Sequence, residues 1–130
     1  MRQNHPYLRA YMAGITVPTL FLLVVVTGFT MLHGVAAPWE RIIMFPMAVV
    51  PNLWGVWNML YCRWRWAPIG VHGAILPLLL VPAGFGLARA LEVPWMSVTG
   101  AAIALPVAVV VYYLAWKYLV GFFNEVLGVA

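Results

Sequence analysis

Long apolar segments without a single charged residue dominate the pattern of the chain. Between the clusters of charge they cover residues 10–39, 42–62, 66–88 and 93–116. A helix needs about 20 mainly apolar residues to cross roughly 30 Å of hydrocarbon. Because lipid offers the backbone no hydrogen bonds, each crossing segment must be helical. The pattern predicts an all-α polytopic membrane protein with four transmembrane helices, at about residues 11–32, 42–62, 67–88 and 95–117.

The connections between these segments are short, which constrains the arrangement of the helices. Short connections place sequential helices side by side and antiparallel, so we expect one compact antiparallel bundle. All of residues 1–130 then form a single transmembrane domain. Residues 118–130 are expected to form an interfacial or cytoplasmic helical tail, because they mix aromatic residues with one Asn and one Glu.

Composition and charge agree with this assignment and indicate an orientation. The chain is 65% hydrophobic and 8% charged, whereas soluble domains contain about 25% charged residues. In the predicted topology one side holds Arg2, Arg9, Arg63, Arg65 and Lys117. The positive-inside rule then places both termini in the cytoplasm, and we expect a bacterial inner membrane. The net charge of +4 suits an anionic inner leaflet and requires no nucleic acid.

The two halves of the sequence contain similar segments. Gly14–Pro18 matches Gly73–Pro77 at an offset of 59 residues, and Phe45–Val50 matches Leu105–Val110 at an offset of 60. These matches favour a tandem repeat of a two-helix hairpin, with parallel repeats related by an axis along the membrane normal. Chance similarity between apolar segments is the alternative.

Prolines recur inside the predicted helices. Proline removes an amide donor and crowds the preceding turn, so it bends or breaks a helix. We expect such kinks at Pro18, Pro46, Pro51, Pro77, Pro82 and Pro106.

The second apolar segment carries the most unusual polar residues. Asn52 falls at its centre, near the bilayer midplane, where an amide without a partner is costly. Trp54, Trp57, Asn58 and Tyr61 follow toward the cytoplasmic end. They could wall a pocket for an apolar, aromatic or cationic guest. Alternatively, the asparagines join helices and the aromatic rings anchor the interface.

Threonines form a stripe along the first apolar segment. Thr16, Thr19, Thr27 and Thr30 share one helical face. Their hydroxyls either bond to helix carbonyls and neighbouring helices, or line a narrow polar path.

Cationic and aromatic residues alternate in the predicted inner loop. Guanidinium groups bind phosphate and indoles favour the membrane interface, so this pattern indicates contact with anionic lipid headgroups. The expected headgroup residues are Arg63, Trp64, Arg65, Trp66 and Lys117.

Residue types that many enzymes and coupled carriers need are missing. The chain contains no Asp, and no predicted span contains a Glu, which disfavours proton-coupled transport. His33 and His72 are expected near opposite membrane faces, and Cys62 is the only cysteine. We therefore expect no catalytic residue, no metal site and no cofactor.

These observations favour a non-catalytic integral membrane protein, which acts as a lipid-binding, accessory or scaffold module. It would bind membrane lipids and could join a homo-oligomer or a larger membrane complex. The alternative is a small oligomeric channel or facilitator for a small ion or an apolar or aromatic solute. In that alternative, the asparagines and the threonine stripe make the polar path.

Overall fold

The computed structural model describes residues 5–34, 48–90 and 97–129 of the chain. All regular structure in these ranges is helical. The elements are α1 (Pro6–His33), α3 (Val50–Trp64), α4 (Ile69–Ala90), α5 (Val98–Leu114), the π-helix η3 (Ala115–Val120) and α6 (Gly121–Val126). The prediction of an all-helical protein is confirmed for the described residues.

Within the described ranges, three helical segments are long and apolar enough to cross a membrane: α1, α4 and the continuous run Val98–Val126. They characterise the chain as an integral membrane protein. The predicted second span, residues 42–62, overlaps α3, whose 15 residues extend only about 22 Å. The first part of that span lies outside the described residues.

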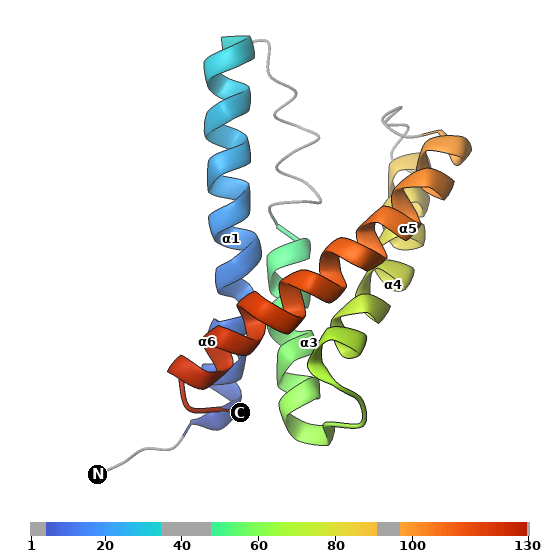
Figure 1. Cartoon of the computed structure of the whole chain (residues 1–130). Helices are drawn as coiled ribbons and strands as arrows, with labels where there is room; N and C mark the ends of the chain where they lie inside the picture. Colours follow the sequence, from blue (N-terminus) through green and yellow to red (C-terminus); the bar gives the residue numbers. More distant parts are fainter. Residues whose placement is uncertain (1–4, 35–47, 91–96, 130) are drawn as a thin grey trace.

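The helices are arranged as two closely packed pairs (Figure 1). α1 packs extensively against α3, and α4 packs extensively against α5. In Figure 1, α1 rises from the lower end and α3 descends beside its lower half. α4 then rises, and the run through α5, η3 and α6 descends across the others to contact α1 near the lower end.

Prolines lie inside three of the helices: Pro18 in α1, Pro77 and Pro82 in α4, and Pro106 in α5. Pro51 instead lies in the first turn of α3, where its missing amide hydrogen would have no helical partner. Pro46 lies outside the described residues.

Glycines allow the closest approaches between helices. A Cβ atom on Gly14 would lie 2.5 Å from the Trp54 carbonyl oxygen, and one on Gly73 would lie 2.0 Å from Trp116 Cγ. Both distances are too short for any side chain. Gly14 therefore sets the contact of α1 with α3, and Gly73 makes room on α4 for the indole of Trp116.

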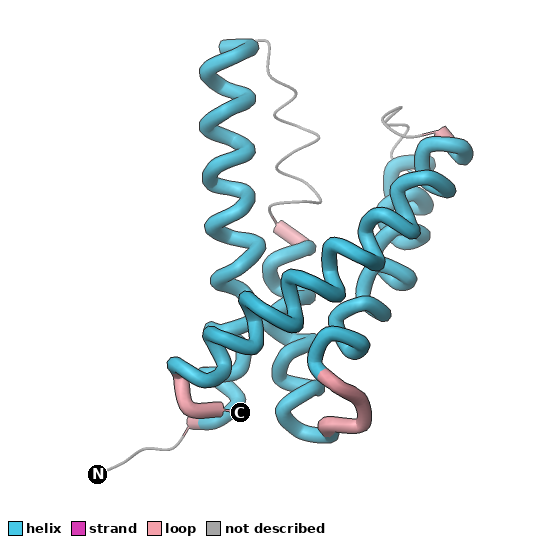
Figure 2. The backbone as a smooth tube through the Cα atoms, viewed as in Figure 1, coloured by secondary structure: helices cyan, strands magenta, loops and turns pink. Residues whose placement is uncertain are grey.

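The apolar core lies in the lower half, where α3, α4 and η3 meet. It comprises Trp54, Leu76, Leu80, Trp116 and Val120, all 5% exposed or less. The smooth tube of Figure 2 shows the α3–α4 connection as a short loop just below this region.

Candidate functional site

Two buried asparagines bond to each other across the molecule. Asn58 Nδ2 donates to Asn124 Oδ1 at 2.7 Å, and Asn124 Nδ2 donates to Asn58 Oδ1 at 3.0 Å. Asn58 Nδ2 also donates to the Ala10 carbonyl oxygen at 2.7 Å. Both side chains are 0% exposed. The pair therefore joins α3 and α6 to each other and to α1.

The π-helix η3 orients Asn124 toward this contact. On a regular α-helix, Trp116 and Asn124 would lie about 80° apart around the axis. A π-helix bonds residue i to i+5, so each of its turns holds an additional residue and winds less per residue. Trp116, Val120 and Asn124 consequently lie along one face, and all three are fully buried.

His72 is the centre of an aromatic cluster between α3 and α4. Its Nε2 donates to the Trp57 carbonyl oxygen at 3.0 Å, because a carbonyl can only accept, and Trp57 Nε1 donates to the His72 carbonyl oxygen at 2.8 Å. The centroid of its ring lies 4.9 Å from that of Trp57, 5.3 Å from Tyr61, 5.5 Å from Trp66 and 5.8 Å from Trp116. Since His72 is only 2% exposed, it fills the space among these rings.

Trp54 also packs in the interior. Its ring lies 4.8 Å from Tyr112 and 5.4 Å from Trp116, measured between centroids. The buried residues of α3 are Pro51, Trp54, Gly55 and Asn58, which is the face that their spacing indicates. Of the residues predicted to form a pocket on this helix, Trp54 and Asn58 are thus packed against other helices.

Asn52 is exposed, yet its amide has two partners. The hydroxyl of Tyr11 donates to Asn52 Oδ1, and Asn52 Nδ2 donates to the Ala48 carbonyl oxygen at 2.7 Å. These bonds tie the start of α3 to α1. Asn52 and Asn58 lie on different faces of α3, so the structure does not bring them together.

The four threonines of α1 direct their hydroxyls to their own helix. Each Oγ1 donates to the carbonyl oxygen four residues earlier, at 2.6 to 2.8 Å, which is the common arrangement for threonine in membrane helices. The acceptor residues are Met12 for Thr16, Ile15 for Thr19, Leu23 for Thr27 and Val26 for Thr30.

Four of the residues predicted to contact headgroups are exposed around the α3–α4 connection: Arg63, Trp64, Arg65 and Trp66. The fifth, Lys117, is exposed on η3. Trp64 is 65% exposed and Trp66 is 57% exposed. Arg65 takes a left-handed backbone conformation, with φ 38°, and its Nη2 donates to the Val129 carbonyl oxygen at 2.9 Å. That bond attaches the connection to the C-terminal segment.

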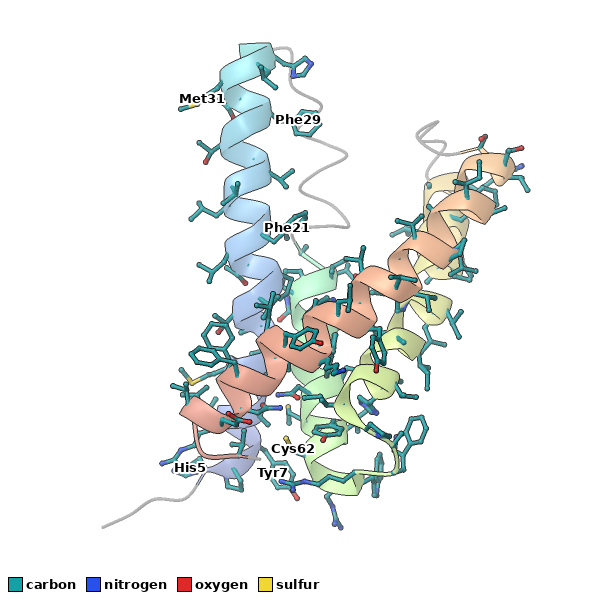
Figure 3. All side chains as sticks on the ribbon, viewed as in Figure 1. His5, Tyr7, Phe21, Phe29, Met31 and Cys62 are labelled. Carbon is teal, nitrogen blue, oxygen red and sulfur yellow. The ribbon has the colours of Figure 1, made fainter. Side chains whose placement is uncertain are left out.

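Two cavities open at this end of the molecule. The smaller one, about 200 Å³, is lined by Pro6, Tyr7, Cys62, Arg63 and Val129. Figure 3 shows Tyr7 and Cys62 at the lower end, close to where α1 starts. The larger one, about 280 Å³, is lined by Tyr61, Ile69, Lys117, Tyr118, Gly121, Phe122 and Glu125. Each cavity therefore contains one of the cations predicted to bind headgroups.

Several residues of these sites were not predicted from the sequence. Asn124 was assigned to a tail, although an isolated amide in an apolar helix is a signal for a buried partner. His72 was considered only as a metal or haem ligand. In the described part of the chain, no group of three His, Cys, Asp or Glu side chains could hold a metal ion.

Comparison of the chain with protein-family models, with curated protein sequences and with solved structures gives no match. The interpretation of the site therefore depends on its own geometry.

Proposed function

We propose that this protein is a non-catalytic membrane protein that binds phospholipid headgroups at the end where α3 meets α4. One observation carries the proposal: cations and exposed indoles gather there around two cavities. Arg63 lines one cavity and Lys117 the other, while Trp64 and Trp66 are exposed between α3 and α4. Guanidinium and ammonium groups bind phosphate, and indoles prefer the interface between lipid and water.

The bonding of the polar residues supports an accessory or scaffold role over a channel. A path for ions or polar solutes needs side chains that can exchange partners with the solute. The amide of Asn58 is buried and paired, and the threonine hydroxyls donate to their own helix. In our proposal these groups stabilise the fold, and they do not form a path for ions or solutes.

The proposed topology is a four-span antiparallel bundle in a bacterial inner membrane, with both termini cytoplasmic. The excess of basic residues at the end that holds Arg63, Arg65 and Lys117 supports this orientation. We also propose that the two helix pairs are tandem repeats. Gly14 and Gly73 support this, because each is buried at a close helix contact and lies four residues before a buried proline.

Native mass spectrometry in a mild detergent tests the proposal. We expect the protein to retain phospholipid, and the substitution Arg63→Gln to lower the affinity for anionic lipid about fivefold. Each basic residue near an anionic surface contributes about 1 kcal/mol. Arg89→Gln is the matched control, because Arg89 lies in the last turn of α4, at the opposite end of that helix. A lipid-free monomer would contradict the proposal.

A further inference from the structure

Two residues of opposite charge line the 280 Å³ cavity. Lys117 and Glu125 both line it, together with the rings of Tyr61, Tyr118 and Phe122. Lys117 lies in η3 and Glu125 in α6, and both side chains are exposed. A cavity that held only an anion would not need the carboxylate.

Neither charge is neutralised within the described part of the chain. Lys117 Nζ lies over the rings of Tyr113 and Tyr118, at 5.8 and 5.2 Å from their centroids. Neither Lys117 nor Glu125 forms an ion pair with another residue described by the structure. The two groups are therefore free to bind a ligand of complementary charge.

The position of Lys117 along its helix places the cavity at headgroup depth. Lys117 follows Val98, the first residue of the apolar run, by 19 positions. At about 1.5 Å per residue this separation is about 29 Å, close to the roughly 30 Å of a hydrocarbon core. If Val98 lies at one face of the membrane, the same helical run therefore places Lys117 near the other face.

From this arrangement we infer that the cavity binds the headgroup of an amine-bearing phospholipid, with the chemistry of phosphoethanolamine; this inference rests on the proposed function. The Lys117 ammonium pairs with the phosphate, while the Glu125 carboxylate accepts hydrogen bonds from the primary ammonium. Tyr61 and Phe122 also line the cavity, and aromatic rings attract a cation of this kind.

The two charges also determine which headgroups bind less well. A headgroup with a phosphate but no amine meets the Glu125 carboxylate as a like charge. A trimethylammonium group keeps its attraction to the rings, but it has no N–H to donate to the carboxylate. Phosphatidylethanolamine should therefore bind more tightly than phosphatidylcholine, from which it differs only in methylation of the nitrogen.

Lipid competition in native mass spectrometry tests the inference. The purified protein, stripped of lipid in detergent, receives equal amounts of phosphatidylethanolamine, phosphatidylcholine and phosphatidylglycerol with matched acyl chains. We expect a two- to fivefold preference for phosphatidylethanolamine over phosphatidylcholine, the range for one exposed ion pair. The ratio within one sample does not depend on how much protein is folded.

Substitutions assign the preference to this cavity. Glu125→Gln should bring the ratio to about one and increase retention of phosphatidylglycerol, whereas Lys117→Gln should weaken retention of all three lipids. Arg89→Gln, at the other end of α4, should change none of these values. An unchanged preference in Glu125→Gln would overturn the inference.

Two further outcomes separate this inference from the proposed function. Equal retention of phosphatidylethanolamine and phosphatidylcholine would overturn the inference and leave the proposed function intact, whereas retention of no phospholipid would overturn both. Soluble phosphoethanolamine is added as a competitor to identify the source of the headgroup. If it binds as tightly as the lipid, the assignment to a membrane lipid is wrong.

Discussion

Asn58 and Asn124 exchange hydrogen bonds in both directions, although 66 positions of the sequence separate them. The pair is fully buried at the contact of α3 and α6, and the carbonyl of Ala10 on α1 accepts from the same Asn58 amide. Three helices that are distant in the sequence thus meet at one amide group. Its contribution to stability is directly measurable.

Replacing one member of the buried pair should lower the stability of the protein. Asn124→Leu leaves Asn58 Oδ1 buried without a donor, and an unsatisfied buried group costs about 1–3 kcal/mol. A double-mutant cycle with Asn58→Leu, followed by thermal melting in detergent, measures the coupling. We expect the double variant to lose less than the sum of the single losses. Strict additivity would show that the pair does not stabilise the fold as a unit.

The asparagine at the start of α3 provides the comparison. Asn52→Leu removes exposed bonds to Tyr11 and Ala48, so we expect a smaller loss of thermal stability than for Asn124→Leu. It also tests the channel alternative, because a channel that depends on Asn52 should lose its flux in proteoliposomes. If the unmodified protein shows flux in proteoliposomes and Asn52→Leu abolishes it, the proposed accessory role is contradicted.

Two glycines of α4 should respond oppositely to the same substitution. In Gly73→Ala the added Cβ would lie 2.0 Å from Trp116 Cγ, so the indole must move and overpacking costs about 1–3 kcal/mol. A Cβ added at Gly86 would meet no atom within 4 Å, so Gly86→Ala should be neutral or stabilise the helix by up to about 1 kcal/mol. Melting curves report stability, and tryptophan emission reports the displacement of Trp116. Equal effects of the two changes would contradict the packing described for Gly73.

The register between η3 and α6 should be required for the asparagine pair. Deleting Phe122, an exposed residue of α6, rotates Asn124 by about 100° around the helix axis relative to Trp116. Asn124 would then face away from Asn58. We expect this deletion to lower the melting temperature at least as much as Asn124→Leu, with little further loss when both are combined, whereas Phe122→Ala should have a small effect. Deleting Leu119 in η3 instead removes the additional residue of the π turn and restores a regular α-helix, so it should cost less than deleting Phe122.

Cys62 offers a test of the proposed orientation, since it is the only cysteine of the chain and lines the 200 Å³ cavity. A membrane-impermeant maleimide should label it rapidly in inverted inner-membrane vesicles and slowly in intact spheroplasts. Cys62→Ser is the control for labelling of other groups. Rapid labelling from the outside would place the α3–α4 end in the periplasm and contradict the proposed topology.

The sequence by itself determined that this protein resides in a lipid membrane and that its secondary structure is helical. Charge-free segments of about 20 residues can only be stable in lipid as helices, because every backbone amide must find a partner within its own segment. Local spacing also places Pro51, Trp54, Gly55 and Asn58 on one face of α3, since a helix repeats at 3.6 residues, and the structure shows that this face is buried. Both conclusions depend on short-range periodicity alone.

Only the tertiary structure decided which polar groups meet. The sequence assigned Asn124 to a surface tail. Its burial depends on the π turn in η3, because that turn changes which side chains of α6 face the other helices. His72 has its aromatic neighbours on α3, on the α3–α4 connection and on η3, so no local pattern could assign them to it. Lys117 and Glu125 lie on one continuous helical run, but the cavity that they line is completed by Tyr61 of α3 and Ile69 of α4. Contacts between helices depend on crossing geometry, and the sequence records only distance along the chain.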